Sequence, residues 1–203
     1  NKNTQWWKPW LFTAAVFMAT VSWSWVNYGG DVSYERLQAK GFETAPTSFH
    51  YLQVAAPLFL IILTRLKVPV STTFLLLSCY AASGNSITAI ALKSISGYGI
   101  AFAAAIVIFF TLGPLMKRAF TGDTHPAWRF AQWITTGTLW SVWLQQDASN
   151  IAVSLPRAMS GVEFAAFASV IVVGLGFMFK KGGERIQEVV EEKSDVADVR
   201  SAT

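Results

Sequence analysis

Three polar side chains interrupt a long apolar run near the middle of the chain. Asp147, Asn150 and Ser154 follow one another at helical spacing, so they share one side of a helix. A carboxylate, an amide and a hydroxyl facing one space offer oxygen ligands for Na⁺, or a relay for a proton. Pro156 ends the helix and is expected to free main-chain carbonyls for a cation. The alternative is that Asp147 only fastens two helices, for example through Arg157.

A second polar cluster opens another apolar run. Pro69 stands at a first helical position, and Ser71, Thr72 and Thr73 follow it. A helix amino terminus exposes N–H groups and a partial positive charge that bind an anion, and the three hydroxyls add donors for a tetrahedral oxyanion. The alternative is a plain helix cap at the membrane interface, next to basic residues.

A third polar break, Gly84-Asn85-Ser86, divides the apolar segment that begins at Pro69. Neither piece spans a bilayer comfortably on its own, because a span needs about 20 residues. The break therefore predicts a discontinuous helix. It acts either as a bend or as a coordinating element, and the bend is the simpler interpretation.

Composition indicates what surrounds these residues. The chain has 203 residues, of which 53% are hydrophobic and 14% charged, against about 25% charged in a soluble domain. Between 52 and 171 the acids are Asp123, Asp147 and Glu163. These features predict an all-α polytopic membrane protein with a multi-pass location in the inner or plasma membrane. The basic residues are scattered between apolar runs, which argues against nucleic-acid binding.

The apolar runs predict a transmembrane domain over 1–183 and a cytoplasmic amphipathic tail over 184–203 that continues beyond the chain end. About six segments are expected, near 10–27, 49–64, 69–92, 98–115, 129–153 and 162–179. Placing the amino end in the cytoplasm puts most lysines and arginines on that side, which favours both ends inside if the segment at 69–92 crosses once. The alternative is a re-entrant hairpin at 69–92, which would reverse this parity.

No cofactor or enzymatic site is predicted. The sequence contains no glycine-rich phosphate loop, no paired catalytic acids and no nucleophile–base set. His125 has no second His or Cys near it, so a metal centre there is not expected, and Na⁺ is the one metal ion considered. Trp133, Trp140 and Trp143 are interpreted as packing or interface residues.

Two of the polar elements together resemble the signatures of the inorganic phosphate transporter family. Residues 69–73 read Pro-Val-Ser-Thr-Thr, as in that family, and Phe74 stands where the family usually has His. Residues 146–151 resemble its Asn-Asp-Val-Ala-Asn-Ala signature; Asp147 and Asn150 match, and Gln replaces the first Asn. The two matches cover a small part of the chain.

The resemblance implies a fold of two inverted repeats with discontinuous helices, each repeat carrying one copy of both signatures. One copy of each occurs here, which favours a partial chain whose second threonine signature lies past residue 203. The resemblance also implies that Ser71, Thr72 and Thr73 bind the anion and that Asp147 and Asn150 serve the cation. Ser154 joins the cation residues because of its helical spacing from them.

The expected function is therefore secondary active transport of phosphate or a related oxyanion, by symport with Na⁺ or H⁺. The expected partners are the anion, the lipid bilayer and a further copy of the chain. The alternative is a non-transporting membrane subunit, or a degenerate family member, whose polar residues hold helices together in a larger complex.

Overall fold

The structure, a computed structural model, describes residues 5–66, 68, 70–80, 84–119 and 125–181. These residues form α-helices and one 3₁₀ turn and contain no strand. The helices are α1 (Trp7–Asn27), α2 (Tyr51–Arg65), α3 (Thr72–Tyr80), α4 (Gly84–Ala119), α5 (Ala127–Ala152) and α6 (Gly161–Lys180), and the 3₁₀ turn is η1 (Gln38–Lys40).

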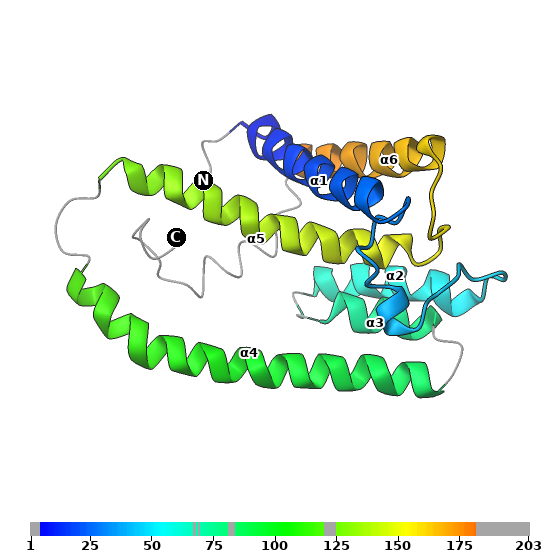
Figure 1. The fold of residues 1–203 in the computed structure, drawn as a ribbon, viewed down its shortest axis with the longest axis horizontal. Helices are drawn as coiled ribbons and strands as arrows, with labels where there is room; N and C mark the ends of the chain where they lie inside the picture. The colour runs from blue at the N-terminus through cyan, green and yellow to red at the C-terminus, as the bar shows by residue number, and fades with distance from the viewer. Residues whose placement is uncertain (1–4, 67, 69, 81–83, 120–124, 182–203) are drawn as a thin grey trace.

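The helices pack in two groups that share α5 (Figure 1). Helix α1 packs on α5 and α6, whereas α3 packs on α2, α4 and α5. Helices α2 and α3 run antiparallel as a short hairpin, and α4 runs past them in the direction opposite to α5. The hairpin thereby places the start of α3 against α5.

Local sequence explains where the helices begin and end. Helix α1 ends at Asn27 because Gly29 and Gly30 adopt φ values of 60° and 94°, in the left-handed region that glycine tolerates best. Helix α6 begins at a capping box: the Ser160 N–H donates to Glu163 Oε2 at 2.7 Å, and the Glu163 N–H donates to Ser160 Oγ at 3.4 Å.

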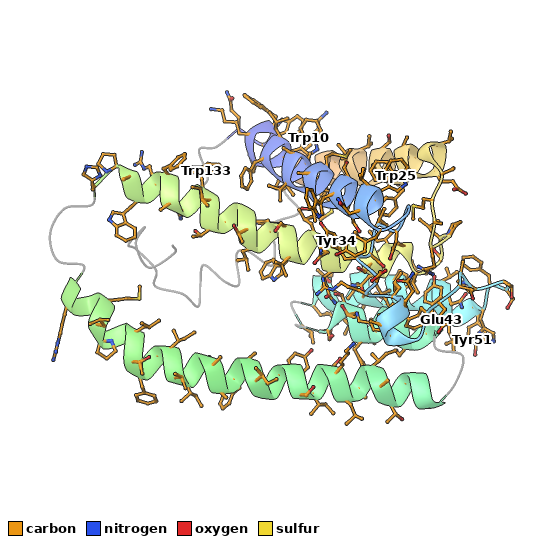
Figure 2. All side chains as sticks on the ribbon, in the orientation of Figure 1. Trp10, Trp25, Tyr34, Glu43, Tyr51 and Trp133 are labelled. Atoms are coloured by element: carbon orange, nitrogen blue, oxygen red, sulfur yellow. The ribbon has the colours of Figure 1, made fainter. Side chains whose placement is uncertain are left out.

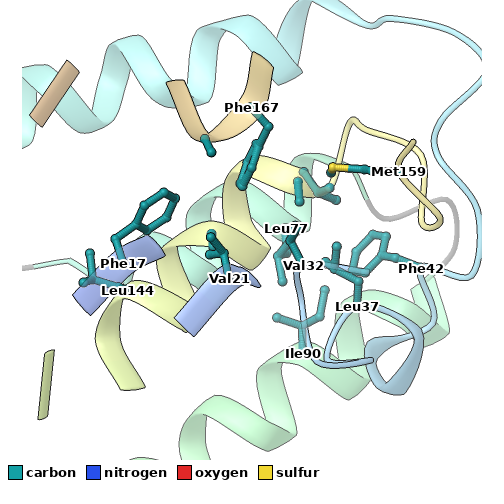
Figure 3. Close-up of a cluster of buried hydrophobic side chains, with 14 residues drawn as sticks. Phe17, Val21, Val32, Leu37, Phe42, Leu77, Ile90, Leu144, Met159 and Phe167 are labelled. Carbon is teal, nitrogen blue, oxygen red and sulfur yellow. The ribbon is translucent and has the colours of Figure 1, made fainter. Parts of the chain in front are cut away.

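The core includes a loop as well as helices (Figure 3). Val32 and Leu37, from the segment between α1 and α2, are completely buried in one cluster with Phe17 of α1 and Leu77 of α3. The same cluster includes Ile90 of α4 and reaches α5 and α6. The loop that follows α1 is therefore packed inside the molecule, and it fixes the position of η1.

Tryptophans of α1 reinforce the contact with α6 (Figure 2). Trp10 Nε1 donates to the carbonyl oxygen of Val172 at 3.0 Å. Trp25 Nε1 donates to the carbonyl oxygen of Met159 at 2.9 Å, and its ring stacks on Phe164 at 5.0 Å between centroids. The Trp10 bond joins the start of α1 to the second half of α6, and the Trp25 bond holds the segment before α6 against the end of α1.

Three helices are long and apolar enough to cross a bilayer: Trp7–Asn27, Ile87–Met116 within α4, and Gly161–Lys180. Helix α5 has 26 residues and carries the polar residues described above. At 1.5 Å per residue, the 15 residues of α2 and the 9 of α3 reach only about 22 and about 13 Å, less than the roughly 30 Å of a hydrocarbon core.

Four expected segments, near 10–27, 49–64, 129–153 and 162–179, agree closely with α1, α2, α5 and α6. The expected boundary between 69–92 and 98–115 was wrong, because α4 runs through it without interruption. Ser94 Oγ donates to the carbonyl of Ile90 at 2.9 Å, so the helix satisfies that hydroxyl internally. Pro69, the side chains of Asn85 and Ser86, and the tail 184–203 lie outside the described residues.

Candidate functional site

The two polar elements of the sequence meet in space at Thr73. Asn150 Nδ2 on α5 donates a hydrogen bond to Thr73 Oγ1 on α3 at 3.2 Å. Gln146 Nε2, one turn earlier on α5, donates to the same oxygen. One hydroxyl oxygen therefore accepts from two amides that lie more than seventy positions away in the sequence.

Buried neighbours of these polar groups hold the contact in place. Leu77 follows Thr73 by one helical turn and is 0% exposed, which anchors α3 in the core. On α5, Leu144 and Ala148 are buried next to the two amides. Because α3 has only 9 residues, its position depends on these contacts rather than on its own helical stability.

A cleft of about 380 Å³ opens beside Thr73. Its walls come from η1, the start of α3, the first half of α4 and α5. The lining residues are Lys40, Ser71, Thr73, Ile90, Lys93, Ser94, Gly97, Tyr98 and Gln146. The lining thus combines two ammonium groups with hydroxyls and one amide, and it contains no carboxylate.

The predicted anion residues occupy different places around this cleft. Ser71 and Thr73 line it, whereas Thr72 is half-buried in the first turn of α3 and lies outside the lining. Ser71 also caps the helix, since its Oγ accepts from the Phe74 N–H at 3.3 Å. The capping alternative therefore describes part of what Ser71 does.

Lys40 is placed at the cleft by the packed loop. Leu37 and Phe42 are buried on either side of η1, and Gly41 ends the turn with a φ of 85°. Burial, together with the charges of Arg36 and Lys93, lowers the pKa of Lys40 to about 8. The two charges that act most on this ammonium group are therefore both cations.

Lys93 reaches the cleft from α4. It lies one turn after Ile90, which is 3% exposed and packs in the core. Lys93 Nζ donates to the carbonyl oxygen of Ala39 at 3.4 Å, so it sits next to η1. Two lysines from distant parts of the chain thus face one small space.

The predicted cation residues are not brought into one cluster by the hydrogen bonds of the described residues. Asn150 is 4% exposed, and its Oδ1 has no hydrogen-bond partner in the part of the chain that the structure describes. Asp147 is exposed on α5 and stands outside the bonds to Thr73. Ser154 lies in the turn after α5 and donates to the carbonyl of Ile151 at 3.4 Å.

The carbonyls at the end of α5 are not free, which corrects one expectation. Arg157 Nη1 donates to the Ala152 oxygen at 2.9 Å, and Nη2 donates to the Val153 oxygen at 2.6 Å. A guanidinium after the last turn satisfies carbonyls that the helix leaves open. Arg157 therefore caps the helix, and these two oxygens are occupied by its N–H groups.

A buried carboxylate that the sequence did not single out is Asp31, which is 3% exposed. Its Oδ1 accepts from the Ser33 N–H at 2.7 Å, and its Oδ2 accepts from Ser33 Oγ and the Glu35 N–H, both at 2.9 Å. Ser24 Oγ donates to the Asp31 carbonyl at 2.7 Å. These bonds fold the loop that positions Lys40, so Asp31 has a structural role.

Sequence reasoning also missed Lys40 and Lys93 as site residues. A signal existed for Lys93, which stands between Ile87 and Ile100 in an apolar helix, where an ionisable residue is a functional candidate by default. No comparable signal existed for Lys40, because the loop around it resembles an ordinary mixed-charge connection.

Comparison with known proteins gives no family for the chain: no family model, curated protein or solved structure matches it. A function is therefore supported by the geometry of the site, together with three helices that are long and apolar enough to cross a membrane.

Proposed function

We propose that this protein is a secondary active transporter that moves phosphate or a related oxyanion by symport with Na⁺ or H⁺. The observation that carries the proposal is the meeting of Thr73 with Gln146 and Asn150 at the edge of a cleft that two lysines line. Coupled transport needs an anion group and a cation group in contact, and here the Thr73 hydroxyl on the short helix α3 bonds to Asn150 on α5.

Asn150 links the two halves of the proposed site. Its Nδ2 holds the Thr73 hydroxyl, while its buried Oδ1 accepts from no group among the described residues. An unpaired buried oxygen is unfavourable unless a ligand satisfies it, and Na⁺ prefers oxygen ligands. A cation at Oδ1 fixes the amide, which in turn fixes Thr73 toward the anion. Asp147 supplies negative charge on the same helix, and Ser154 follows in the next turn.

The moving element in this proposal is the short α2–α3 hairpin. It carries Ser71 and Thr73, whereas Asn150 belongs to the longer helix α5. Rocking of the hairpin against α1, α5 and α6 alternates the access to the site. Helices α1 and α5 run in one direction, and α4 and α6 run in the opposite direction (Figure 1). These directions are compatible with a multi-pass protein of the inner or plasma membrane that has both ends on one side.

The test is uptake of labelled phosphate by proteoliposomes of the full chain, driven by an inward Na⁺ gradient or by a pH gradient. We expect accumulation that collapses when the gradient is dissipated. Asn150→Ala and Asp147→Ala are each expected to remove the gradient-driven part. Thr138→Val is the matched control, since Thr138 is exposed on α5 and donates only to the carbonyl of Ile134 in its own helix. Absence of uptake under both gradients, or full uptake by Asp147→Ala, would refute the proposal.

A second function is favoured by the exposure of Asp147. A carboxylate at the surface of a helix among apolar residues is costly against lipid, so it favours a covering partner. In that case the chain is a non-transporting subunit of a larger membrane complex, or of an assembly of identical chains. This alternative predicts that Asp147→Asn weakens assembly, measured by size-exclusion chromatography in detergent, and leaves solute flux unchanged.

A further inference from the structure

Positive charge gathers at the cleft next to Thr73. Among the described residues, no acidic side chain forms an ion pair with it. Lys40 enters from η1 and Lys93 from α4, and Arg36 stands near Lys40 on the same loop. Arg36 Nη1 is engaged, because it donates to Gln145 Oε1 at 3.1 Å. The two lysines are therefore the cations that face the cleft.

The uncharged part of the lining suits an oxyanion. Ser71 and Thr73 at the start of α3 and Tyr98 of α4 contribute hydroxyls, and Gln146 of α5 contributes an amide. The Ser94 hydroxyl also lines the cleft, but it donates to the carbonyl of Ile90 in its own helix. Hydroxyl and ammonium groups that converge from several sides match the oxygens of a tetrahedral ion, which accepts hydrogen bonds in every direction. The volume, about 380 Å³, is at the small end of the roughly 300–1,000 Å³ of ligand pockets, so the ligand is small.

We propose that this cleft binds a doubly charged tetrahedral oxyanion, held mainly by the ammonium groups of Lys40 and Lys93. The inference deepens the proposed transport function and, for its role in transport, rests on it. It adds a charge requirement: two neighbouring ammonium groups repel each other, and a dianion compensates both, whereas a monoanion such as nitrate compensates one.

A dependence on pH follows for the binding. The charged groups that act on Lys40 are Arg36 from its own loop and Lys93 from α4, and α4 also contributes the phenol of Tyr98 to the cleft. The start of α3 and α5 present Ser71, Thr73 and Gln146, which do not titrate. The pKa of Lys40 in the free protein is about 8. The affinity for the dianion is therefore highest below this pH, and it falls above this pH as Lys40 loses its proton. Sulfate keeps both charges across this range, and its affinity should be roughly tenfold weaker at about pH 9 than at about pH 7.

The experiment measures binding of ³⁵S-sulfate and ³²P-phosphate to the full chain in nanodiscs of neutral lipid, with nitrate as the singly charged competitor. Lys40→Met and Lys93→Met should each weaken sulfate binding at neutral pH by at least about tenfold. Lys180→Met is the matched control, an exposed lysine at the end of α6, and it should change the affinity less than about twofold.

Lys40→Arg keeps the proposal testable if the methionine variants fold poorly. Arginine keeps its charge at every pH used, so this variant should bind sulfate at neutral pH and lose the tenfold weakening at about pH 9. Retention of the full pH dependence by Lys40→Arg would overturn the assignment of Lys40.

The phosphate of a lipid headgroup presents the same chemistry as free phosphate. A second set of nanodiscs that contain phosphatidic acid distinguishes free phosphate from the headgroup phosphate. Binding of free sulfate in neutral lipid supports a site for a solute. Retention of phosphatidic acid without binding of free sulfate supports a site for a headgroup. Either result supports the dianion site if Lys40→Met and Lys93→Met remove it.

Failures of the two proposals give different results. Wild-type protein that accumulates phosphate, while Lys40→Met and Lys93→Met bind sulfate like Lys180→Met, would overturn the lysine site and leave transport standing. Wild-type protein that binds sulfate through the lysines without accumulating phosphate would keep the site and overturn transport. No saturable binding of sulfate, phosphate or phosphatidic acid would overturn the site.

Discussion

Replacing Thr73 with valine tests whether α3 and α5 meet through its hydroxyl. Valine keeps the shape of threonine and removes the one oxygen that accepts from Asn150 Nδ2 and from Gln146 Nε2. A buried donor left without its acceptor costs about 1–3 kcal/mol. Asn150 is 4% exposed and bears this cost, whereas Gln146 lines the cleft, where water replaces its partner. We therefore expect Thr73→Val to lower the free energy of unfolding by about 1–3 kcal/mol.

The assay is thermal unfolding in detergent at a fixed protein and detergent concentration. For a chain of this size, a loss of 1 kcal/mol lowers Tm by about 2–4 °C, so the expected decrease is about 2–12 °C. Thr138→Val removes an exposed hydroxyl that bonds only within α5, and it should change Tm by less than about 2 °C.

A double-mutant cycle then assigns the effect to the pair. Once Thr73 is valine, Asn150→Ala should cost less than it does in the wild type, with a coupling energy of about 0.5–3 kcal/mol. Equal Tm values for Thr73→Val and Thr138→Val, or a coupling energy of zero, would refute the contact between α3 and α5 as described.

Two further predictions concern the loop that carries Lys40. Gly30→Ala should lower the free energy of unfolding by about 2–5 kcal/mol, because Gly30 has a φ of 94° and an added Cβ would lie 2.8 Å from the Met159 nitrogen; Gly99→Ala in α4, with open space around it, should have no such effect in the same denaturation assay. Lys40→Met should raise Tm at neutral pH, since removing the cation relieves its burial and its repulsion by Arg36 and Lys93. This gain in Tm should be constant below about pH 8 and shrink toward pH 10.5, where Lys40 of the unfolded chain also loses its proton. A gain in Tm that grows with pH would contradict the lowered pKa of Lys40.

Parts of the fold followed from sequence because their causes are local. The bounds of α1, α2, α5 and α6 depend on caps and breakers, such as Gly29 after α1 and Ser160 before α6, which can be recognised without knowing what they contact. The continuity of α4 could not be predicted so simply. Ser94 and Ser96 lie between the expected segments 69–92 and 98–115, yet each hydroxyl bonds to a carbonyl of the same helix, which continues through them.

The candidate site followed from sequence only where a polar residue interrupts an apolar run, as Asn150 and Thr73 do. Lys40 could not be found this way, since its place depends on Leu37 and Phe42 entering a core built from distant helices. The expectation of free carbonyls at the end of α5 was wrong for a similar reason. Arg157 reaches these carbonyls only because the turn after α5 folds back toward the helix.

The central claim is that one asparagine couples a cation to an oxyanion, and thermodynamic linkage tests it most directly. The measurement is the affinity of the full chain for labelled phosphate with and without the cation that drives uptake, in wild type and in Asn150→Ala. We predict that the cation raises the affinity of the wild type by about 5- to 150-fold and that Asn150→Ala loses this increase while still binding phosphate weakly. An affinity that the cation does not change, or an unchanged increase in Asn150→Ala, would contradict the coupling through Asn150.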